Sequence, residues 1–266
     1  MFDLHLGDSL EVMKTLPDGS FDLVITSPPY NLLNSSGGGF SGIKDHTWRN
    51  PALKNGYDGH DDCMPRDEYV AWQKAVLSEC WRLLTPTGAI YYNHKPRVQY
   101  GELEMPLDLN PGLPLRQIII WKRAGGINYS PTFYMPVHEW IMIFAKPDFR
   151  LISKGLSGMG DVWDMNQERN NPHPASFPIE LPLRILETAP AARVLDPFMG
   201  SGTTGVACAQ KGIDFTGIEK GPKYYEMAKF RLERAALADF TSWRDCFDEN
   251  CEQVNTLTPA IDGLFD

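Results

Sequence analysis

The chain alternates short apolar runs, typical of buried strands, with segments whose apolar residues recur at helical spacing. We expect strands at residues 2–6, 21–25, 89–93, 115–121, 137–145, 193–195 and 213–218. We expect helices after Ser9, over 67–84, after Pro178, after Thr203 and over 224–238, with Ser9 and Asp67 as N-caps of the first two. Strands and helices alternate along the chain, and this order predicts an α/β fold with a parallel sheet.

The second of these strands ends in a rigid turn, Thr26-Ser27-Pro28-Pro29-Tyr30-Asn31. Neither proline has an N–H, so the pair cannot extend a sheet. The turn therefore falls at the carboxyl end of the strand, where open α/β sheets bind ligands. The Ser27 hydroxyl, a free carbonyl of the proline pair and the Tyr30 ring would form a cup for a planar amine. Taken alone, the same residues are also typical of an ordinary turn.

The composition is that of an ordinary globular chain. Its 266 residues suffice for one large α/β domain, with 42% hydrophobic and 22% charged residues. No apolar run reaches membrane length and the N-terminus lacks the features of a signal peptide, so we expect a cytoplasmic protein without membrane contact. Five scattered cysteines, none in a C-x-x-C pair, predict reduced thiols rather than a disulfide framework or a zinc site.

The net charge of −9 argues against general binding to nucleic acid, but the charge is unevenly distributed. Residues 244–266 hold six acidic residues and one basic residue, whereas residues 116–154 hold six basic and two acidic residues. The second segment is compatible with a basic face for DNA, and scattered surface charge explains it equally well. For Lys122 and Arg123, phosphate contact and solvent exposure are equally good predictions.

A second motif lies between a strand and a helix and has the sequence Asp196-Pro197-Phe198-Met199-Gly200-Ser201-Gly202-Thr203-Thr204. Its glycines let a backbone approach a ligand, and the helix N-terminus faces that ligand. Glu219 ends the next strand, about twenty residues on, where nucleotide-binding α/β folds use an acid to bond ribose hydroxyls. Gly205 completes the spacing of a dinucleotide site, so a nicotinamide oxidoreductase is one alternative. Asp196 would instead repel a pyrophosphate and attract the cationic amino acid end of S-adenosylmethionine.

Together, Ser27-Pro28-Pro29-Tyr30 and Asp196-Pro197-Phe198-Met199-Gly200-Ser201-Gly202 resemble the amino-methylating DNA methyltransferases, which modify adenine N6 or cytosine N4. The catalytic motif precedes the cofactor motif, which resembles the permuted β group of that family. The resemblance implies an α/β fold with a seven-stranded, mostly parallel sheet and helices on both faces. The strand from Val137 would be the antiparallel one.

The resemblance covers the chain to about Ala238 and implies a methyltransferase domain over residues 1–238. That domain would carry inserted loops at 31–66 and 122–136 and a short recognition segment at 146–160, and an acidic tail would follow at 239–266. The loop 31–66 comes directly after the proline turn. We interpret it as a flap over the substrate, with a solvent loop as the alternative.

The resemblance also implies roles for individual residues. Ser27, Pro28, Pro29 and Tyr30 would form the catalytic site, where the Ser27 hydroxyl and the Pro28 carbonyl accept hydrogen bonds from the amine and Tyr30 stacks on the base. Glu219 would hold the ribose of S-adenosylmethionine, and Asp8 would lie near its adenine. The expected cofactor residues are Asp8, His173, Ala175, Phe177, Asp196, Phe198, Gly200, Gly202, Thr203 and Glu219.

The expected partner is double-stranded DNA, from which the target base must be flipped out to react. Neither a metal nor a cysteine nucleophile is needed. Serine rather than aspartate at position 27 leans toward cytosine N4, although the serine form occurs with both bases. The resemblance leaves room for a homodimer and for a cognate restriction endonuclease. The alternatives are an RNA or protein methyltransferase of the same fold and a nucleic-acid-binding relative without turnover.

Other polar and aromatic residues carry no assigned chemistry. His138 and Glu139 are interpreted as strand packing and surface rather than an acid–base pair. Trp163 is assigned to the core, and the role of Asn93, at the end of a predicted strand, is left open.

Overall fold

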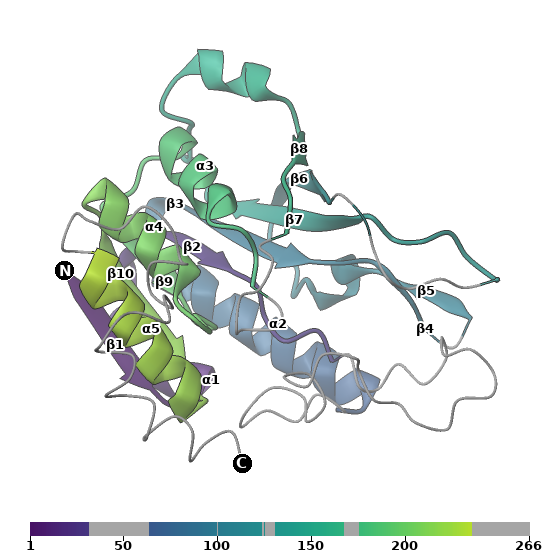
Figure 1. Ribbon diagram of the computed structural model, residues 1–266, viewed down its shortest axis with the longest axis horizontal. Coiled ribbons are helices and arrows are strands. Elements are labelled where there is room, and N and C mark those ends of the chain that lie inside the picture. Colours follow the sequence, from purple (N-terminus) through teal and green to yellow (C-terminus); the bar gives the residue numbers. More distant parts are fainter. Residues whose placement is uncertain (32–63, 100, 124, 126–130, 168–175, 236–266) are drawn as a thin grey trace, which may run out of the picture.

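The computed structural model describes residues 1–31, 64–99, 101–123, 125, 131–167 and 176–235. Its centre is one sheet of eight strands in the order β1-β10-β9-β2-β3-β7-β6-β8 (Figure 1). The strands are β1 (Phe2–Leu6), β2 (Phe21–Thr26), β3 (Leu84–His94), β6 (Leu115–Lys122), β7 (His138–Ala145), β8 (Val162–Asp164), β9 (Arg193–Asp196) and β10 (Asp214–Glu219). The expected number of seven is therefore wrong by one strand. The addition is β8, which extends the edge beside β6.

Strand direction places the two sequence motifs side by side. Strand β7 runs antiparallel to both β3 and β6, as expected of the strand from Val137, and the other pairs in the sheet are parallel. Strand β2 lies between β9 and β3. The turn after β2 and the glycine loop after β9 therefore leave the same edge of the sheet next to each other. A small hairpin of β4 (Arg97–Gln99) and β5 (Glu102–Glu104), which was not expected, projects beyond β3.

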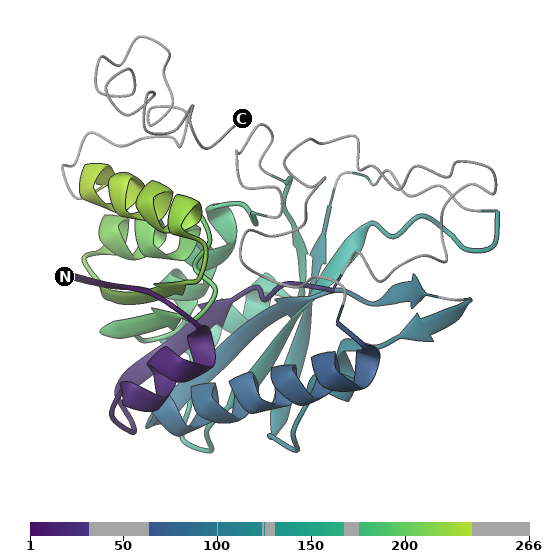
Figure 2. The same cartoon turned by 90° about the horizontal axis from the view of Figure 1, so that it is seen from below.

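Helices cover both faces of the sheet, as expected (Figures 1 and 2). Helices α1 (Ser9–Thr15) and α2 (Arg66–Leu83) pack on one face, and α3 (Glu180–Thr188), α4 (Thr203–Lys211) and α5 (Pro222–Ala235) pack on the other. Side chains of β2 alternate between the two cores, because successive strand residues point to opposite faces. Leu23 and Ile25 join the core under α3–α5, and Val24 joins the core under α1 and α2.

Among the described residues there are also two short 3-10 helices, η3 (Pro106–Leu109) and η4 (Lys154–Met159). Helix η4 falls in the segment 146–160, whose recognition role stays a prediction. Most of the loop 31–66, part of the loop 122–136 and the tail 239–266 lie outside the described residues. None of the helices in the described ranges has the length and apolar character needed to cross a bilayer.

The expected N-caps of the first two helices are wrong. Asp8 caps α1, and its carboxylate accepts hydrogen bonds from the N–H groups of Leu10 and Glu11. An N-cap needs an extended backbone, which Asp8 has, whereas Ser9 is already helical. The Ser9 hydroxyl instead donates to the Pro197 carbonyl in the glycine loop. Helix α2 starts at Arg66 without a side-chain cap.

We predict that Gly202→Ala destabilises the protein by about 2–4 kcal/mol, because it combines backbone strain with overpacking. Gly202 has φ +81°, and an added Cβ would lie 2.8 Å from Leu232 Cδ1 in α5. Gly212, at the other end of α4, has φ +66° with open space around it, so Gly212→Ala isolates the backbone cost of about 1–2 kcal/mol. Urea denaturation measures the free energy of unfolding of both variants, and equal losses would show that contact with Leu232 adds nothing to the backbone cost.

Candidate active site

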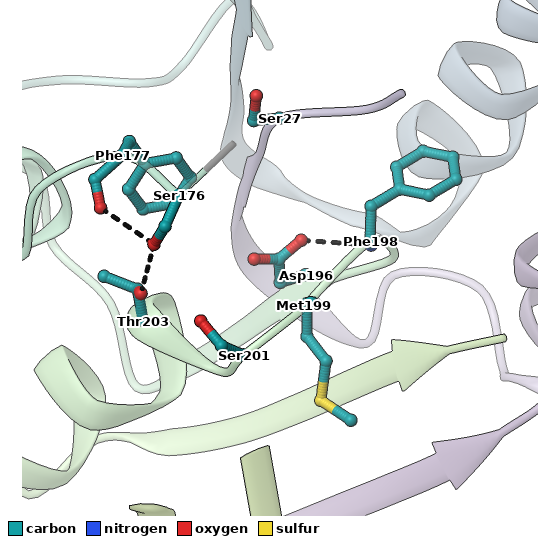
Figure 3. Close-up of a pocket in the computed structure, with 9 residues that line it drawn as sticks. Ser27, Ser176, Phe177, Asp196, Phe198, Met199, Ser201 and Thr203 are labelled. Atoms are coloured by element: carbon teal, nitrogen blue, oxygen red, sulfur yellow. Dashed lines mark hydrogen bonds between the residues drawn. The ribbon is translucent and has the colours of Figure 1, made fainter. Parts of the chain in front are cut away.

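The carboxyl ends of β2 and β9 open onto a shared pocket (Figure 3). Its lining comes from the turn after β2, the segment before α3 and the loop between β9 and α4. The lining residues are Ser27, Ser176, Phe177, Asp196, Phe198, Met199, Gly200, Ser201 and Thr203. The structure thus brings the expected catalytic Ser27 into one pocket with five of the expected cofactor residues, which are Phe177, Asp196, Phe198, Gly200 and Thr203.

Asp196 is a buried carboxylate at the floor of this pocket. Its Oδ1 accepts hydrogen bonds from the Thr26 hydroxyl at 2.7 Å and the Phe198 N–H at 3.1 Å, and its Oδ2 accepts one from the Thr204 hydroxyl at 2.7 Å. Burial raises the pKa of Asp196 to about 6, while these three hydrogen bonds act to lower it. The side chain therefore joins the end of β2, the glycine loop and α4 at one point.

The glycine loop is held from β10 and α5. Gly200 donates its N–H to Glu219 Oε2 at 2.9 Å, and Gly221 donates to Glu219 Oε1 at 2.7 Å. Burial is the main cause that raises the pKa of Glu219. From α5, the buried Arg231 donates to the Ser201 carbonyl at 2.5 Å and to its hydroxyl at 2.9 Å. These contacts with Glu219 and Arg231 fix the shape of the glycine loop.

The remaining expected cofactor residues lie around the pocket or outside the described chain. Gly202 faces α5 rather than the pocket lining. Asp8 lies at the start of α1, where its Oδ2 is 3.5 Å from the Lys220 ammonium. His173 and Ala175 fall outside the described residues, so their expected place in the pocket stays a prediction.

The proline turn is anchored from behind by α2 and the hairpin. The Pro29 carbonyl accepts hydrogen bonds from the Tyr69 hydroxyl at 2.8 Å and from Gln73 Nε2 at 3.4 Å. Arg97 of β4 donates to the Tyr30 carbonyl at 2.6 Å. These contacts hold the backbone of the turn against α2 and β4. Ser27 lies at the edge of the pocket, with its hydroxyl directed away from Asp196, as Figure 3 shows.

A polar cluster lies on the other side of Ser27, away from the glycine loop. Tyr30 Oη is 2.9 Å from Ser27 Oγ, 2.7 Å from Asn93 Nδ2 and 3.0 Å from Glu139 Oε2. Asn93 Nδ2 also donates to Glu139 Oε2 at 2.8 Å, and Arg123 Nη1 lies 3.1 Å from Glu139 Oε1. The Asn93 and Glu139 side chains are buried, so this network is shielded from water.

The Tyr30 ring itself is only 6% exposed. It lies 4.5 Å from the His94 ring, measured between centroids, and 5.6 Å below the Lys95 ammonium. Burial lowers the pKa of His94 to about 3, so the imidazole facing Tyr30 is neutral at physiological pH. Stacking of Tyr30 on a target base stays a prediction.

Several residues of the site were missed or misassigned from the sequence. Glu139 was interpreted, with His138, as strand packing and surface, yet it is 5% exposed and lies in the polar cluster with Asn93. Arg123 pairs with that carboxylate, whereas Lys122 is exposed and pairs with Asp164. Trp163 is buried, as expected. The only sequence signal for Glu139 was its position near a strand end, and its partners depend on the register between β3 and β7.

The basic segment 116–154 does not form one face. Lys122 and Arg123 lie at the site end of β6, whereas Arg116 lies at the opposite end and donates to the Lys146 carbonyl at 3.2 Å. The Lys146 ammonium lies 4.1 Å above the Trp81 ring, on the far side from the pocket. The charge count along the chain therefore overstated the positive charge near the site.

Comparisons with known proteins agree with this geometry. The family model N6_N4_Mtase, described as DNA methylase, matches residues 21–230. The chain is 29% identical to Type II methyltransferase M.BglII from Bacillus subtilis and 27% identical to Type II methyltransferase M.HinfI from Haemophilus influenzae. Each match covers 85% of this chain and 67% of the relative.

Two solved structures show the same fold. TTHA0409 from Thermus thermophilus, solved in complex with S-adenosyl-L-methionine, is 27% identical over 90% of this chain and 96% of that chain, with a TM-score of 0.63. The cytosine-N4-specific PvuII DNA methyltransferase aligns over 93% of this chain and 90% of its own, with a TM-score of 0.67. At 19% identity, the second match supports the fold alone.

We predict that loss of a hydroxyl donor to Asp196 lowers the free energy of unfolding more at high pH than at low pH. The pKa of Asp196 is about 6 in the folded protein, above the ordinary value of 3.8. Ionising Asp196 therefore lowers the free energy of unfolding, and this loss develops between these two pKa values and is complete above the higher one. The Thr204 hydroxyl reduces this loss. Thr204→Val should therefore lose about 1.5–3 kcal/mol at pH 8 and clearly less at pH 5, where the folded carboxyl is protonated.

Denaturant unfolding at the two pH values measures this difference. Thr188→Val is the matched control, because the buried Thr188 hydroxyl donates to backbone carbonyls of α3 and should lose the same free energy at both pH values. A pH-independent loss in Thr204→Val would show that Asp196 does not depend on that hydroxyl.

Proposed function

The chain belongs to the DNA methylase family whose model spans residues 21–230, and on this premise we propose that it is a site-specific DNA amino-methyltransferase. It would transfer a methyl group from S-adenosylmethionine to the exocyclic amino group of a base in double-stranded DNA. The observation that carries the proposal is the shared pocket, which is lined both by Ser27 of the proline turn and by Asp196 and Gly200 of the cofactor loop.

The residues around the pocket fit S-adenosylmethionine, the cofactor of this methyltransferase. Its amino acid end carries an ammonium and a carboxylate. Asp196 offers a negative charge to the first, and the N-terminus of α4, which has no side-chain cap among the described residues, offers N–H groups to the second. Each Glu219 oxygen uses one lone pair on a backbone N–H and keeps another for a ribose hydroxyl.

When bound, S-adenosylmethionine supplies an electrophilic methyl group on a sulfonium centre. The nucleophile is the amine of the base, which is weak because its lone pair is delocalised into the ring. The protein must therefore make this nitrogen more nucleophilic. Ser27 Oγ can accept a hydrogen bond from one N–H of that amine, which favours a pyramidal nitrogen with a localised lone pair. The Pro28 carbonyl is the proposed second acceptor. Positioning of the amine against the methyl group supplies most of the acceleration.

The target base must leave the duplex to reach this pocket, because its amine is paired in the helix. We propose cytosine N4 as the first target to test, since serine rather than aspartate stands at position 27. Adenine N6 is the alternative target. A homodimer and a cognate restriction endonuclease stay predictions, as does recognition through residues 146–160.

The proposal is tested by incubating the protein with methyl-labelled S-adenosylmethionine and unmethylated genomic DNA, followed by nucleoside analysis. We expect labelled N4-methylcytosine, and N6-methyladenine would move the assignment to adenine. RNA and protein acceptors are run in parallel. If the protein binds the cofactor but labels no DNA, the acceptor assignment is wrong.

Ser27→Ala tests the role of the hydroxyl. We expect a rate of methyl transfer lower by about a hundredfold or more, because one hydrogen-bond acceptor for the amine is lost. The dissociation constant for S-adenosylmethionine should stay within about threefold, since the contacts that hold the cofactor loop do not involve Ser27. A parallel loss of cofactor binding would show that Ser27 acts by shaping the pocket.

A further inference from the structure

Glu139 is a buried carboxylate that the proposed methyl transfer does not use. It lies at the start of β7, is 5% exposed and pairs with Arg123 at 3.1 Å. Burying a charged pair beside a pocket is costly unless the geometry is good, and strand packing would be served as well by an apolar side chain. Its contacts run through Tyr30 to Ser27, the residue that faces the amine.

The shortest contacts in this cluster favour one arrangement of donors and acceptors. Tyr30 has one hydroxyl proton, and it donates this proton to Glu139 Oε2 at 3.0 Å. Asn93 Nδ2 has two protons, which fit Tyr30 Oη at 2.7 Å and Glu139 Oε2 at 2.8 Å. The Ser27 hydroxyl is then the donor in its 2.9 Å contact with Tyr30 Oη. Asn93 Nδ2 also lies 3.4 Å from Ser27 Oγ, a longer contact than its other two. With the Asn93 protons on Tyr30 and Glu139, Ser27 Oγ can accept from a ligand.

We propose that Glu139 is a positioning residue that acts through Tyr30 to set Ser27 as a hydrogen-bond acceptor, and that it receives the proton the amine releases. This inference rests on the proposed amino-methyltransferase function. Methylation of an amine releases a proton, and the inference names the group that accepts it.

The proton step balances along the chain of contacts. After the nitrogen gains the methyl group it is positively charged and still carries both of its original protons. One proton passes to Ser27 Oγ as the Ser27 proton passes to Tyr30 Oη and the Tyr30 proton passes to Glu139 Oε2. The products are a neutral methylamine and a neutral Glu139 carboxyl, with the two hydroxyls restored. No oxidant, reductant or further reactant is required.

The surrounding contacts support this role. Arg123 contacts the other carboxylate oxygen, Oε1, at 3.1 Å and leaves Oε2 to Tyr30 and Asn93. Asn93 Oδ1 is buried and has no partner among the described residues, although its Nδ2 holds both Tyr30 and Glu139. Its amide is thus oriented by the cluster, and its oxygen remains available to a donor on a ligand.

The test uses single-turnover methyl transfer to duplex DNA, with the full-length protein in excess and labelled S-adenosylmethionine. Tyr30→Phe cuts the chain of contacts in the middle while it keeps the aromatic ring and the Glu139–Arg123 pair. Tyr225→Phe is the matched control, because its hydroxyl donates to the Leu4 carbonyl of β1, away from the pocket. We expect a rate about a hundredfold lower for Tyr30→Phe and an unchanged rate for Tyr225→Phe.

Glu139→Gln and Glu139→Asp separate proton uptake from packing. Gln keeps the size but cannot accept the proton at neutral pH, whereas Asp keeps the carboxylate and shortens the side chain. The proposal expects Asp to retain more activity than Gln, with cofactor affinity within about threefold in both. It also expects the double variant with Tyr30→Phe and Glu139→Gln to be about as slow as either single variant, because both interrupt one path.

Two results would overturn the inference while the proposed function stands. One is a Tyr30→Phe rate within about threefold of the unmodified protein. The other is a Glu139→Gln variant that is at least as active as Glu139→Asp, since a packing role favours the isosteric amide. If the unmodified protein binds S-adenosylmethionine but methylates no DNA, the proposed function and this inference are both wrong.

Discussion

A buried carboxylate, Asp196, is the constraint on which the arrangement of the site depends. A charge without hydrogen-bond partners could not remain in this interior, so its three donors must be in place in the folded protein. Two of them, from the glycine loop and α4, belong to the same motif as Asp196, and the third comes from β2, which is distant in the sequence. Because Thr26 directly precedes Ser27, the hydrogen bond from Thr26 also sets the distance between the proline turn and the cofactor loop.

Two groups of elements hold the two parts of the proposed site, one on each side of Asp196. Strands β9 and β10 with helices α4 and α5 hold the glycine loop, through Glu219 and Arg231. Strands β2, β3 and β7 hold the polar cluster that contains Ser27 and Glu139. Since β2 and β9 are neighbours in the sheet, the order of the motifs along the chain does not affect how they meet. Side chains of α2 then hold the turn through the Pro29 carbonyl, and Ser27 lines the pocket.

Most of the fold followed from the sequence because apolar runs and glycine or proline turns are local signals. Strand β8 was missed because three residues are too few for a pattern, and its pairing depends on Ile120 of β6. The motifs located the pocket, including Asp196 and Ser27. The hydrogen bonds of Glu139 with Tyr30 and Asn93 could not be predicted, since they require the register that sets Asn93 opposite Ile141. The caps of α1 and α2 were missed because the choice between adjacent residues depends on backbone angles.

The most direct test of this account is a crystal structure of the protein with S-adenosylmethionine bound. We expect the amino acid end of the cofactor between Asp196 and the N-terminus of α4, a ribose hydroxyl on Glu219, and the sulfonium methyl group directed toward Ser27. Binding at another edge of the sheet, or a methyl group directed away from Ser27, would contradict the claim that the proline turn and the glycine loop form one active site.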